Sequence, residues 1–232
     1  MARLARLAVA GLVHQLIQRG NNGQDIFIDR PDRESYLHLL REAAAANQVA
    51  IHAYALTDSE VLLLATPGDA GGLSRMMQSL GRRYVARFNR RHGRSGTLWE
   101  GRFRATVIEA ERHLHACICF VELAPVRAGL AREAQDHPWS SARHHLGLAS
   151  DPLVGDHALY WAMGNTPFER EAAHRQLLER GLTAEQARTI ADATHKGWAL
   201  GSEAFKAALE EHTRRRVQPG LRGRPRKVAA KG

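Results

Sequence analysis

Four residues in one short segment have the types and the spacing of metal ligands. His113 and Cys117 form one His-x-x-x-Cys pair, and His115 and Cys119 form another. Residues four apart on a helix lie on the same face and can share a zinc ion. The two pairs are offset by two residues, however, and positions two apart point roughly 200° from each other around a helix. We therefore predict buried cysteines beside surface histidines rather than a metal site.

A second group of residues is suited to binding phosphate. Arginine dominates between residues 81 and 104, and its planar guanidinium group matches the oxygens of a phosphate. Trp99 lies among these charges and could stack on an unpaired base, with packing in the core as the competing interpretation. The predicted DNA-binding residues of this segment are Arg82, Arg83, Arg87, Arg90, Arg91, Arg102, Arg104 and Trp99.

The C-terminus offers a third binding motif. Arg222, Gly223, Arg224 and Pro225 form an Arg-Gly-Arg-Pro sequence of the AT-hook kind. In such a motif an extended backbone fits the narrow minor groove of A·T-rich DNA between two arginines. The motif is short, so a general polybasic arm is the competing interpretation. Either version predicts strongly salt-dependent binding to nucleic acid.

The overall composition favours an anionic partner. The 232 residues include 33 Lys and Arg against 24 Asp and Glu, for a formal charge of +9 and a pI near 10.3. The two cysteines lie too close on one predicted helix to bridge each other, which fits a reducing cytosol. No segment approaches the ~20 apolar residues of a membrane span. We expect a soluble cytoplasmic protein with no membrane partner. Surface or phosphate-side positions are expected for His92, His144 and His145.

Hydrophobic periodicity predicts the elements that position these residues. Strands are predicted at residues 9–18, 49–56, 60–66 and 103–108, and helices at residues 32–46, 73–88 and 111–123. Asp32 is the expected N-cap of the first helix, and Thr57-Asp58-Ser59 the turn of a hairpin. This order predicts an α+β fold, a ferredoxin-like antiparallel sheet with helices on one face.

The remaining sequence predicts a helical appendage and a basic tail. We place domain boundaries so that residues 1–150 form the sheet domain, residues 151–212 the appendage and residues 213–232 a disordered arm. Thr183 and Gln186 form a predicted capping box, and Ser202 is a predicted N-cap. The segment around Trp198 either joins two helices of a helix-turn-helix-like module or simply packs the appendage.

Six segments form a set of motifs that is specific when taken together. They are Gln18-Arg19-Gly20-Asn21-Asn22, Arg82-Arg83-Tyr84, Phe88-Asn89-Arg90-Arg91-His92, Gly96-Thr97-Leu98-Trp99-Glu100-Gly101-Arg102-Phe103, Glu122-Leu123-Ala124-Pro125-Val126-Arg127-Ala128-Gly129 and Pro138-Trp139-Ser140-Ser141. Through them nearly the whole chain resembles the REP-associated tyrosine transposases, bacterial relatives of the single-tyrosine HUH nucleases. The resemblance implies binding to hairpin or single-stranded DNA, and cleavage by a tyrosine that becomes linked to the phosphate.

The catalytic positions that the resemblance implies are degenerate here. Two histidines of the family, separated by one residue on a strand, hold Mg²⁺ or Mn²⁺, and the matching positions are Glu60 and Leu62. The family's nucleophilic tyrosine matches Phe120, which has no hydroxyl to attack a phosphodiester. We therefore predict no catalytic residues, no metal and no cofactor at this site. Tyr54 and Tyr84 could replace the nucleophile, but packing is the favoured interpretation of both.

Three functions fit these observations. The first is a DNA-binding protein that holds hairpin or single-stranded DNA, with A·T-rich flank contacts, and does not cut it. The second is an active transposase with a displaced active site, and the third is an RNA-binding regulatory protein. Whether the chain is an enzyme stays open at this point, as does a homodimeric state.

Overall fold

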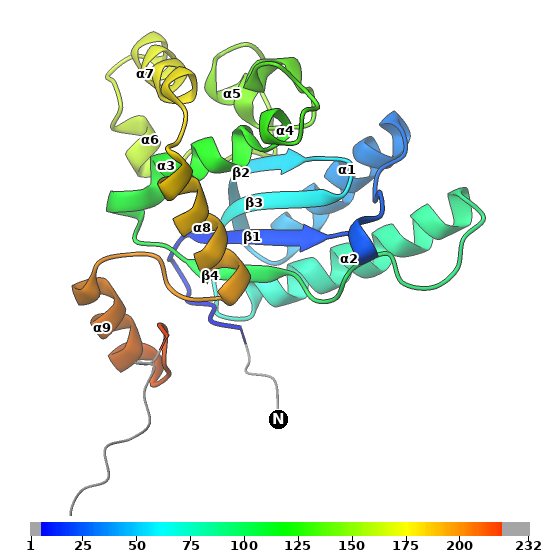
Figure 1. Cartoon of the computed structure of the whole chain (residues 1–232), viewed down its shortest axis with the longest axis horizontal. Helices are drawn as coiled ribbons and strands as arrows, with labels where there is room; N and C mark the ends of the chain where they lie inside the picture. The colour runs from blue at the N-terminus through cyan, green and yellow to red at the C-terminus, as the bar shows by residue number, and fades with distance from the viewer. Residues whose placement is uncertain (1–5, 220–232) are drawn as a thin grey trace, which may run out of the picture.

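A four-stranded antiparallel sheet forms the centre of the molecule (Figure 1). The computed structural model describes residues 6–219. The strands are β1 (His14–Arg19), β2 (Val49–Leu56), β3 (Glu60–Pro67) and β4 (Arg104–Val107), in the spatial order β2-β3-β1-β4. Three helices connect or follow them: α1 (Arg30–Ala46), α2 (Gly72–Arg91) and α3 (Ala110–Glu122). The predicted element order and the α+β class are confirmed.

Helices cover both faces of this sheet, so the prediction that they cover one face was wrong. On one face Leu16 and Leu63 pack in a core with the apolar sides of α1 and α2. On the other face Ile17 and Leu62 pack against α3 and the later helix α8 (Ala184–Lys196). In Figure 1, α8 crosses the strands on the side that faces the viewer. Strand β3 is therefore a continuous apolar run from Val61 to Ala65, as expected for a strand that is buried on both sides.

Local geometry shifts two of the predicted boundaries. The N-cap of α1 is Asp29, whose carboxylate accepts a hydrogen bond from the backbone N–H of Asp32. Asp32 is instead an acidic residue of the first turn, where its negative charge interacts favourably with the positive end of the helix dipole. Strand β1 begins only at His14, because Gly11 adopts a positive φ of 74° in the turn that precedes it.

Segments from later in the chain cover the outer strands. Next to β2, the backbone N–H of Leu56 donates to the Trp139 carbonyl, and the N–H of Gly155 donates to the Ile51 carbonyl. Next to β4, the N–H of Leu200 donates to the Val107 carbonyl. The segment around Trp198 thus lies along the edge of the sheet.

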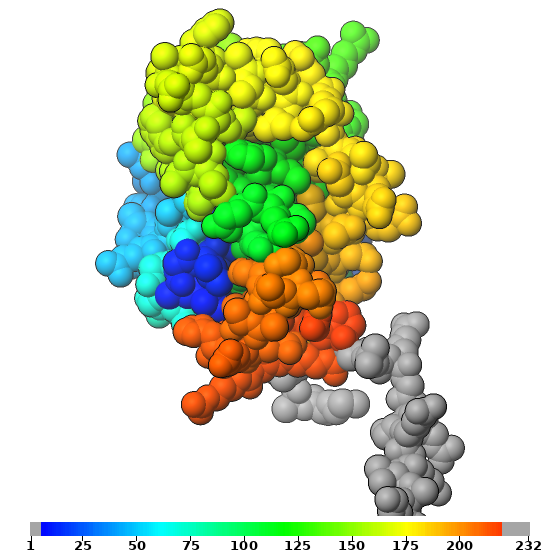
Figure 2. All heavy atoms as spheres, turned by 90° about the vertical axis from the view of Figure 1, so that its left-hand side faces the viewer, coloured from blue at the N-terminus to red at the C-terminus, as the bar shows by residue number. Residues whose placement is uncertain are grey.

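The C-terminal half contributes helices to both ends of the molecule. They are α4 (Ala124–Arg127), α5 (Ala142–His145), α6 (Ala158–Trp161), α7 (Pro167–Arg180) and α9 (Glu203–Thr213). Leu209 of α9 packs with Leu7 and Val9 of the N-terminal segment, and Figure 2 shows this segment in blue beside α9 in orange. The predicted caps at Thr183 and Ser202 are confirmed. Side chains from both sides of residue 150 pack together. The domain boundary placed there stays a prediction. Residues 6–219 contain no helix that is long and apolar enough to cross a bilayer.

A buried histidine at the start of β1 is hydrogen-bonded in its neutral form. The Nδ1–H group of His14 donates to the Leu12 carbonyl at 2.8 Å, and Nε2 accepts from the Val9 backbone N–H at 3.2 Å. A proton on Nε2 would face the N–H of Val9, and the ring is fully buried. Burial lowers the pKa of His14 to about 4, against a smaller opposite effect of the bond to Leu12.

We expect this histidine to destabilise the fold in mild acid. Between pH 6.5 and about 4 the unfolded chain binds a proton at His14 and the folded chain does not. The free energy of unfolding therefore decreases as the pH is lowered through this window. The expected contribution is about 1.4 kcal/mol per pH unit in this window. Urea unfolding of the wild type and of His14→Gln at several pH values measures it, and the variant should show the shallower dependence. Parallel curves would contradict the assignment.

Candidate nucleic-acid interface

The three degenerate positions of the sequence lie close together at one end of the sheet. Leu62 on β3 and Phe120 on α3 belong to one apolar cluster and are 2% and 6% exposed. Glu60 lies opposite Arg19 of β1, and its carboxylate forms an ion pair with the Arg19 Nε at 2.5 Å. The site that the resemblance implies is thus assembled in space, but it contains an ion pair and packed apolar side chains.

An arginine covers the ring at the nucleophile position. The guanidinium carbon of Arg127 lies 4.1 Å from the centroid of the Phe120 ring, and its terminal NH2 group donates to the Phe120 carbonyl at 2.5 Å. Burial lowers the pKa of Arg127 to about 10, and the charge of Glu60 opposes that shift. The position beside Phe120 therefore carries a fixed cation, suited to holding a phosphate rather than to attacking it.

The tyrosines of the chain are buried. The sequence has four, Tyr36, Tyr54, Tyr84 and Tyr160, and their exposed fractions lie between 0% and 5%. The Tyr84 hydroxyl donates to the Ile26 carbonyl at 2.5 Å, and the Tyr54 hydroxyl donates to the Asp151 carboxylate at 2.6 Å. Burial raises the pKa of both hydroxyls well above the ordinary value. The packing interpretation of Tyr54 and Tyr84 is confirmed.

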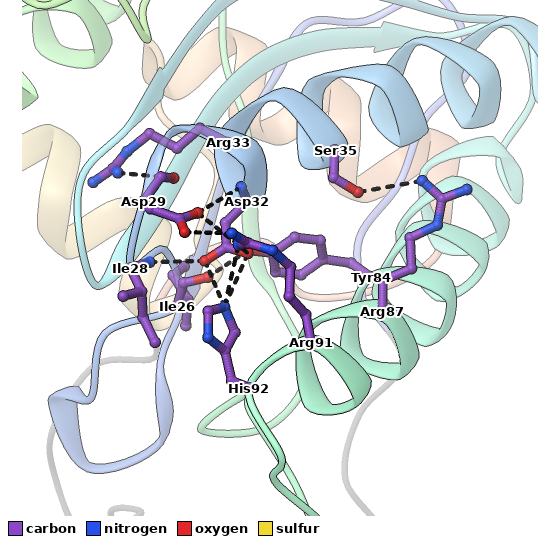
Figure 3. Close-up of polar contacts among 10 residues, drawn as sticks. All are labelled: Ile26, Ile28, Asp29, Asp32, Arg33, Ser35, Tyr84, Arg87, Arg91 and His92. Atoms are coloured by element: carbon purple, nitrogen blue, oxygen red, sulfur yellow. Dashed lines mark hydrogen bonds and ion pairs between the residues drawn. The ribbon is translucent and has the colours of Figure 1, made fainter.

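Several of the arginines on α2 face acidic or polar groups of α1 (Figure 3). Arg91 forms ion pairs with Asp29 and Asp32, and the Arg87 guanidinium donates to the Ser35 hydroxyl at 3.2 Å. Arg83 forms an ion pair with Glu42 at 2.5 Å, so part of the positive charge on this helix is balanced within the chain.

Asp32 is the centre of that arrangement. Its side chain is 2% exposed and accepts hydrogen bonds from the backbone N–H of Ile28 and from Arg91, while the His92 ring lies 2.9 Å away (Figure 3). This carboxylate joins the start of α1 to the end of α2. His92, which we expected at the surface or beside phosphate, is half-buried against it.

Trp99 lies at the border of the core. Its ring packs edge-on against Tyr36 and tilted against Tyr84, with centroid separations of 6.5 and 6.0 Å. The ring is half-buried and belongs to the periphery of the α1–α2 core. These contacts leave only part of the ring for a nucleic-acid base.

Arg102 lies between three cavities beside β4. One of them, about 170 Å³ in volume, is lined by basic groups from distant segments and, within the part of the chain that the structure describes, by no carboxylate. Its charged lining residues are Arg6, Arg102, Arg104, Lys196 and Arg215, and the rings of Phe103, Trp198 and His195 lie beside them. We call this cavity the basic groove. Among residues 6–219, neither Arg102 nor Arg215 forms an ion pair.

Arg102 also lines the two neighbouring cavities. One, about 340 Å³ in volume, runs from Arg102 and Phe103 to Ser74 and Gln78 of α2. Arg82 follows Gln78 by four residues and therefore continues the same face of this helix. The other, about 30 Å³ in volume, is lined by Arg19, Arg102 and Arg104 together with the carboxylate of Glu100, and its Arg19 forms the ion pair with Glu60. A chain of phosphates along this path would pass from α2 to the degenerate site.

A buried polar cluster is the part of the structure that the sequence did not predict. Glu122 on α3 binds His145 of α5 through Nδ1 at 2.6 Å and His174 of α7 through Nε2 at 2.7 Å. The three side chains are 0% to 1% exposed, so the prediction of a surface position for His145 was wrong. Burial raises the pKa of Glu122, and the two imidazoles outweigh that effect and hold it well below its ordinary range. These residues have the types and spacing of metal ligands.

The remaining predicted residues lie as follows. Cys117 and Cys119 are buried free thiols, and His113 and His115 are half-buried, so the cysteines confirm their predicted place in the core. Burial raises the pKa of both thiols, which makes them poor metal ligands and nucleophiles. Arg90 is exposed on α2. The AT-hook-like residues Arg222, Gly223, Arg224 and Pro225 lie outside the described residues.

One comparison with a solved structure supports this fold. A REP-associated tyrosine transposase bound to a REP hairpin aligns with a TM-score of 0.52 and 16% identity, over 68% of this chain and 92% of that chain. A candidate transposase from Deinococcus radiodurans aligns with a TM-score of 0.38 and 18% identity, over 56% and 98%. No family model and no curated protein matches the sequence. The resemblance seen in the sequence is thus confirmed at the level of the fold, which is that of a REP-associated tyrosine transposase.

Proposed function

We propose that this protein binds hairpin or single-stranded DNA through the basic groove and does not cleave it. The observation that carries the proposal is the position of Arg102, an exposed arginine that joins three cavities beside β4. Guanidinium groups from separate parts of the chain line the groove, and within residues 6–219 neither Arg102 nor Arg215 forms an ion pair with a carboxylate. Such a site binds phosphate oxygens without regard to base sequence.

Aromatic rings beside these charges favour unpaired bases as part of the ligand. The half-buried Trp198 lines the basic groove, and the Arg216 guanidinium carbon lies 5.8 Å from its ring centroid. Phe103 is 7% exposed and its ring is covered by the Arg6 guanidinium at 3.7 Å, so Trp198 is the ring that a base could stack on. Single-strand binding proteins combine a positive groove with rings on which bases stack. The solved transposase with the same fold was bound to a REP hairpin, which supports a hairpin as the ligand of this chain. Minor-groove contact by Arg222, Gly223, Arg224 and Pro225 is part of the proposal.

The absence of cleavage rests on the groups at the degenerate site. Leu62 has no lone pair for a metal ion, Phe120 has no nucleophilic oxygen, and Glu60 is already paired with Arg19. The hydroxyls of Tyr54 and Tyr84 are buried and hydrogen-bonded, so neither reaches a phosphodiester. Glu122, His145 and His174 do not replace the lost metal site, because a substrate phosphate has no access to groups that are 0% to 1% exposed.

Incubation with labelled DNA hairpins tests both halves of the proposal. We expect the purified protein to retard a DNA hairpin with single-stranded flanks, and to give neither a shortened strand nor a covalent adduct with Mg²⁺ or Mn²⁺. An adduct on denaturing gels would show that the chain is an active transposase. An RNA hairpin at matched salt is the second arm, and binding at least tenfold tighter than to DNA would favour an RNA-binding function instead.

A further inference from the structure

The buried cluster of Glu122, His145 and His174 joins three helices that are far apart in the sequence. Their ligand atoms all lie within 4.8 Å of one another, and the side chains come from α3, α5 and α7. Neither His145 nor His174 is more than 1% exposed, and Glu122 is fully buried. Three convergent groups with lone pairs are unusual in a protein interior, where ionisable side chains need strong compensation.

We propose that these three residues form a structural zinc site that fastens the helical appendage to α3. Two imidazole nitrogens and one carboxylate oxygen are a donor set that zinc binds, and a water molecule would complete four-coordination. The Ser141 Oγ lies 2.6 Å from Glu122 Oε1.

Groups around His145 are placed as partners of a zinc-ligating histidine usually are, whereas the outer nitrogen of His174, Nδ1, is buried without a hydrogen-bond partner among the described residues. An Asp156 oxygen lies 3.5 Å from Nε2 of His145, the ring nitrogen that points away from Glu122. A carboxylate at the far nitrogen of a ligating histidine fixes the ring and its tautomer. The Tyr160 hydroxyl donates to the His145 carbonyl at 2.9 Å and holds the backbone of the same residue.

The charges of the cluster also favour a divalent cation. Glu122 and Asp156 together carry two negative charges, and their side chains are 0% and 15% exposed. One Zn²⁺ ion balances both carboxylates while both imidazoles remain neutral, as metal ligation requires. Without the ion, protonated imidazoles would have to supply that balance in a site from which water is largely excluded.

Zinc binding would change the hydrogen bonds of the cluster in a defined way. The two imidazole nitrogens now lie 2.6 and 2.7 Å from the Glu122 oxygens, as hydrogen-bond donors. Ligands on a tetrahedral zinc ion with bonds near 2.0–2.1 Å lie about 3.3 Å apart. The imidazoles therefore withdraw from the Glu122 oxygens by about 0.6–0.7 Å when the ion enters.

The site is structural because it lies away from the DNA-binding path. Glu122 follows Phe120 by two residues on α3, and positions two apart on a helix point roughly 200° from each other. Phe120 faces the sheet, whereas Glu122 faces α5 and α7. The proposal therefore stands or falls independently of DNA binding.

Metal loading of the untagged full-length protein tests the site. After chelation and dialysis, we expect one Zn²⁺ to bind per chain and Co²⁺ to give the visible absorption of a four-coordinate ion. At a hundredfold excess of Zn²⁺ over its Kd, Tm should rise by roughly 5–10 °C. If Zn²⁺ neither binds stoichiometrically nor raises Tm, the cluster is only a hydrogen-bonded ion pair and the proposal is wrong.

Two variants and one control separate this site from adventitious binding. His174→Ala and Glu122→Gln should lose the Co²⁺ absorption and the Zn²⁺-dependent rise in Tm. His52→Gln alters another buried histidine, whose ring nitrogens contact the Gly155 carbonyl and the Thr66 hydroxyl, and should keep both signals. Full Zn²⁺ binding by His174→Ala would overturn the assignment. If a variant does not fold, the comparison of chelated and zinc-loaded wild type still decides.

Discussion

Replacing Arg102 and Arg215 with alanine is expected to weaken binding to a DNA hairpin with single-stranded flanks by about 25-fold near 0.1 M salt. Each phosphate contact on a single strand contributes about 0.7 to the slope of log K against log salt, so the loss of two contacts flattens the slope by about 1.4. Both arginines line the basic groove, and neither forms an ion pair within residues 6–219. Fluorescence anisotropy at four or five salt concentrations measures both quantities.

The control for this experiment removes the same charge from a different face. Arg75 and Arg83 on α2 form ion pairs with Asp69 and Glu42. Arg75→Ala/Arg83→Ala therefore lowers the net charge by the same two units, and exposed pairs of this kind contribute little to stability. We expect its salt slope to change by less than half as much. An equal loss of affinity in the control would place the binding surface on α2, or reduce the effect to net charge alone.

Replacing Glu122 with alanine is expected to destabilise the fold by about 3–5 kcal/mol, measured in the presence of a chelator. The substitution leaves the hydroxyl of Ser141 and the imidazoles of His145 and His174 without their shared acceptor, in a region that water does not reach. For a chain of this size, Tm should fall by roughly 10 °C. Calorimetry or thermal circular dichroism measures the change.

Glu111→Ala is the matched control on the same helix. Glu111 is exposed in the first turn of α3, so its loss should change the free energy of unfolding by no more than about 0.5 kcal/mol. A similarly small loss in Glu122→Ala would mean that the buried cluster contributes little beyond what an apolar core would provide.

The parts of the fold that the sequence predicted are those encoded locally. The capping box at Thr183 and Gln186 needs only residues three apart, and the β2–β3 hairpin needs one short turn. Helices on both faces of the sheet were not predicted, although the apolar run from Val61 to Ala65 indicated them. An uninterrupted apolar strand of this length indicates burial on both faces, whereas alternation would indicate one.

The candidate sites depended on partners that are distant in the sequence. Glu122 meets His145 and His174 across separations of 23 and 52 residues, and no periodicity or motif connects them. Likewise, Arg83 is balanced by Glu42 and Arg91 by Asp29, 41 and 62 residues away. Counting arginines located the basic region of the chain, but only tertiary structure separates those that are paired on α1 from those that line the basic groove.

The covered edges of the sheet restrict how two copies of the chain could associate. Where outer strands expose their peptide groups, proteins extend one sheet into another or into fibrils. Here the backbones of Trp139 and Gly155 form hydrogen bonds with peptide groups of β2, and the backbone of Leu200 forms one with the end of β4. A homodimer would therefore meet through surfaces other than the sheet edges, without a shared intermolecular sheet.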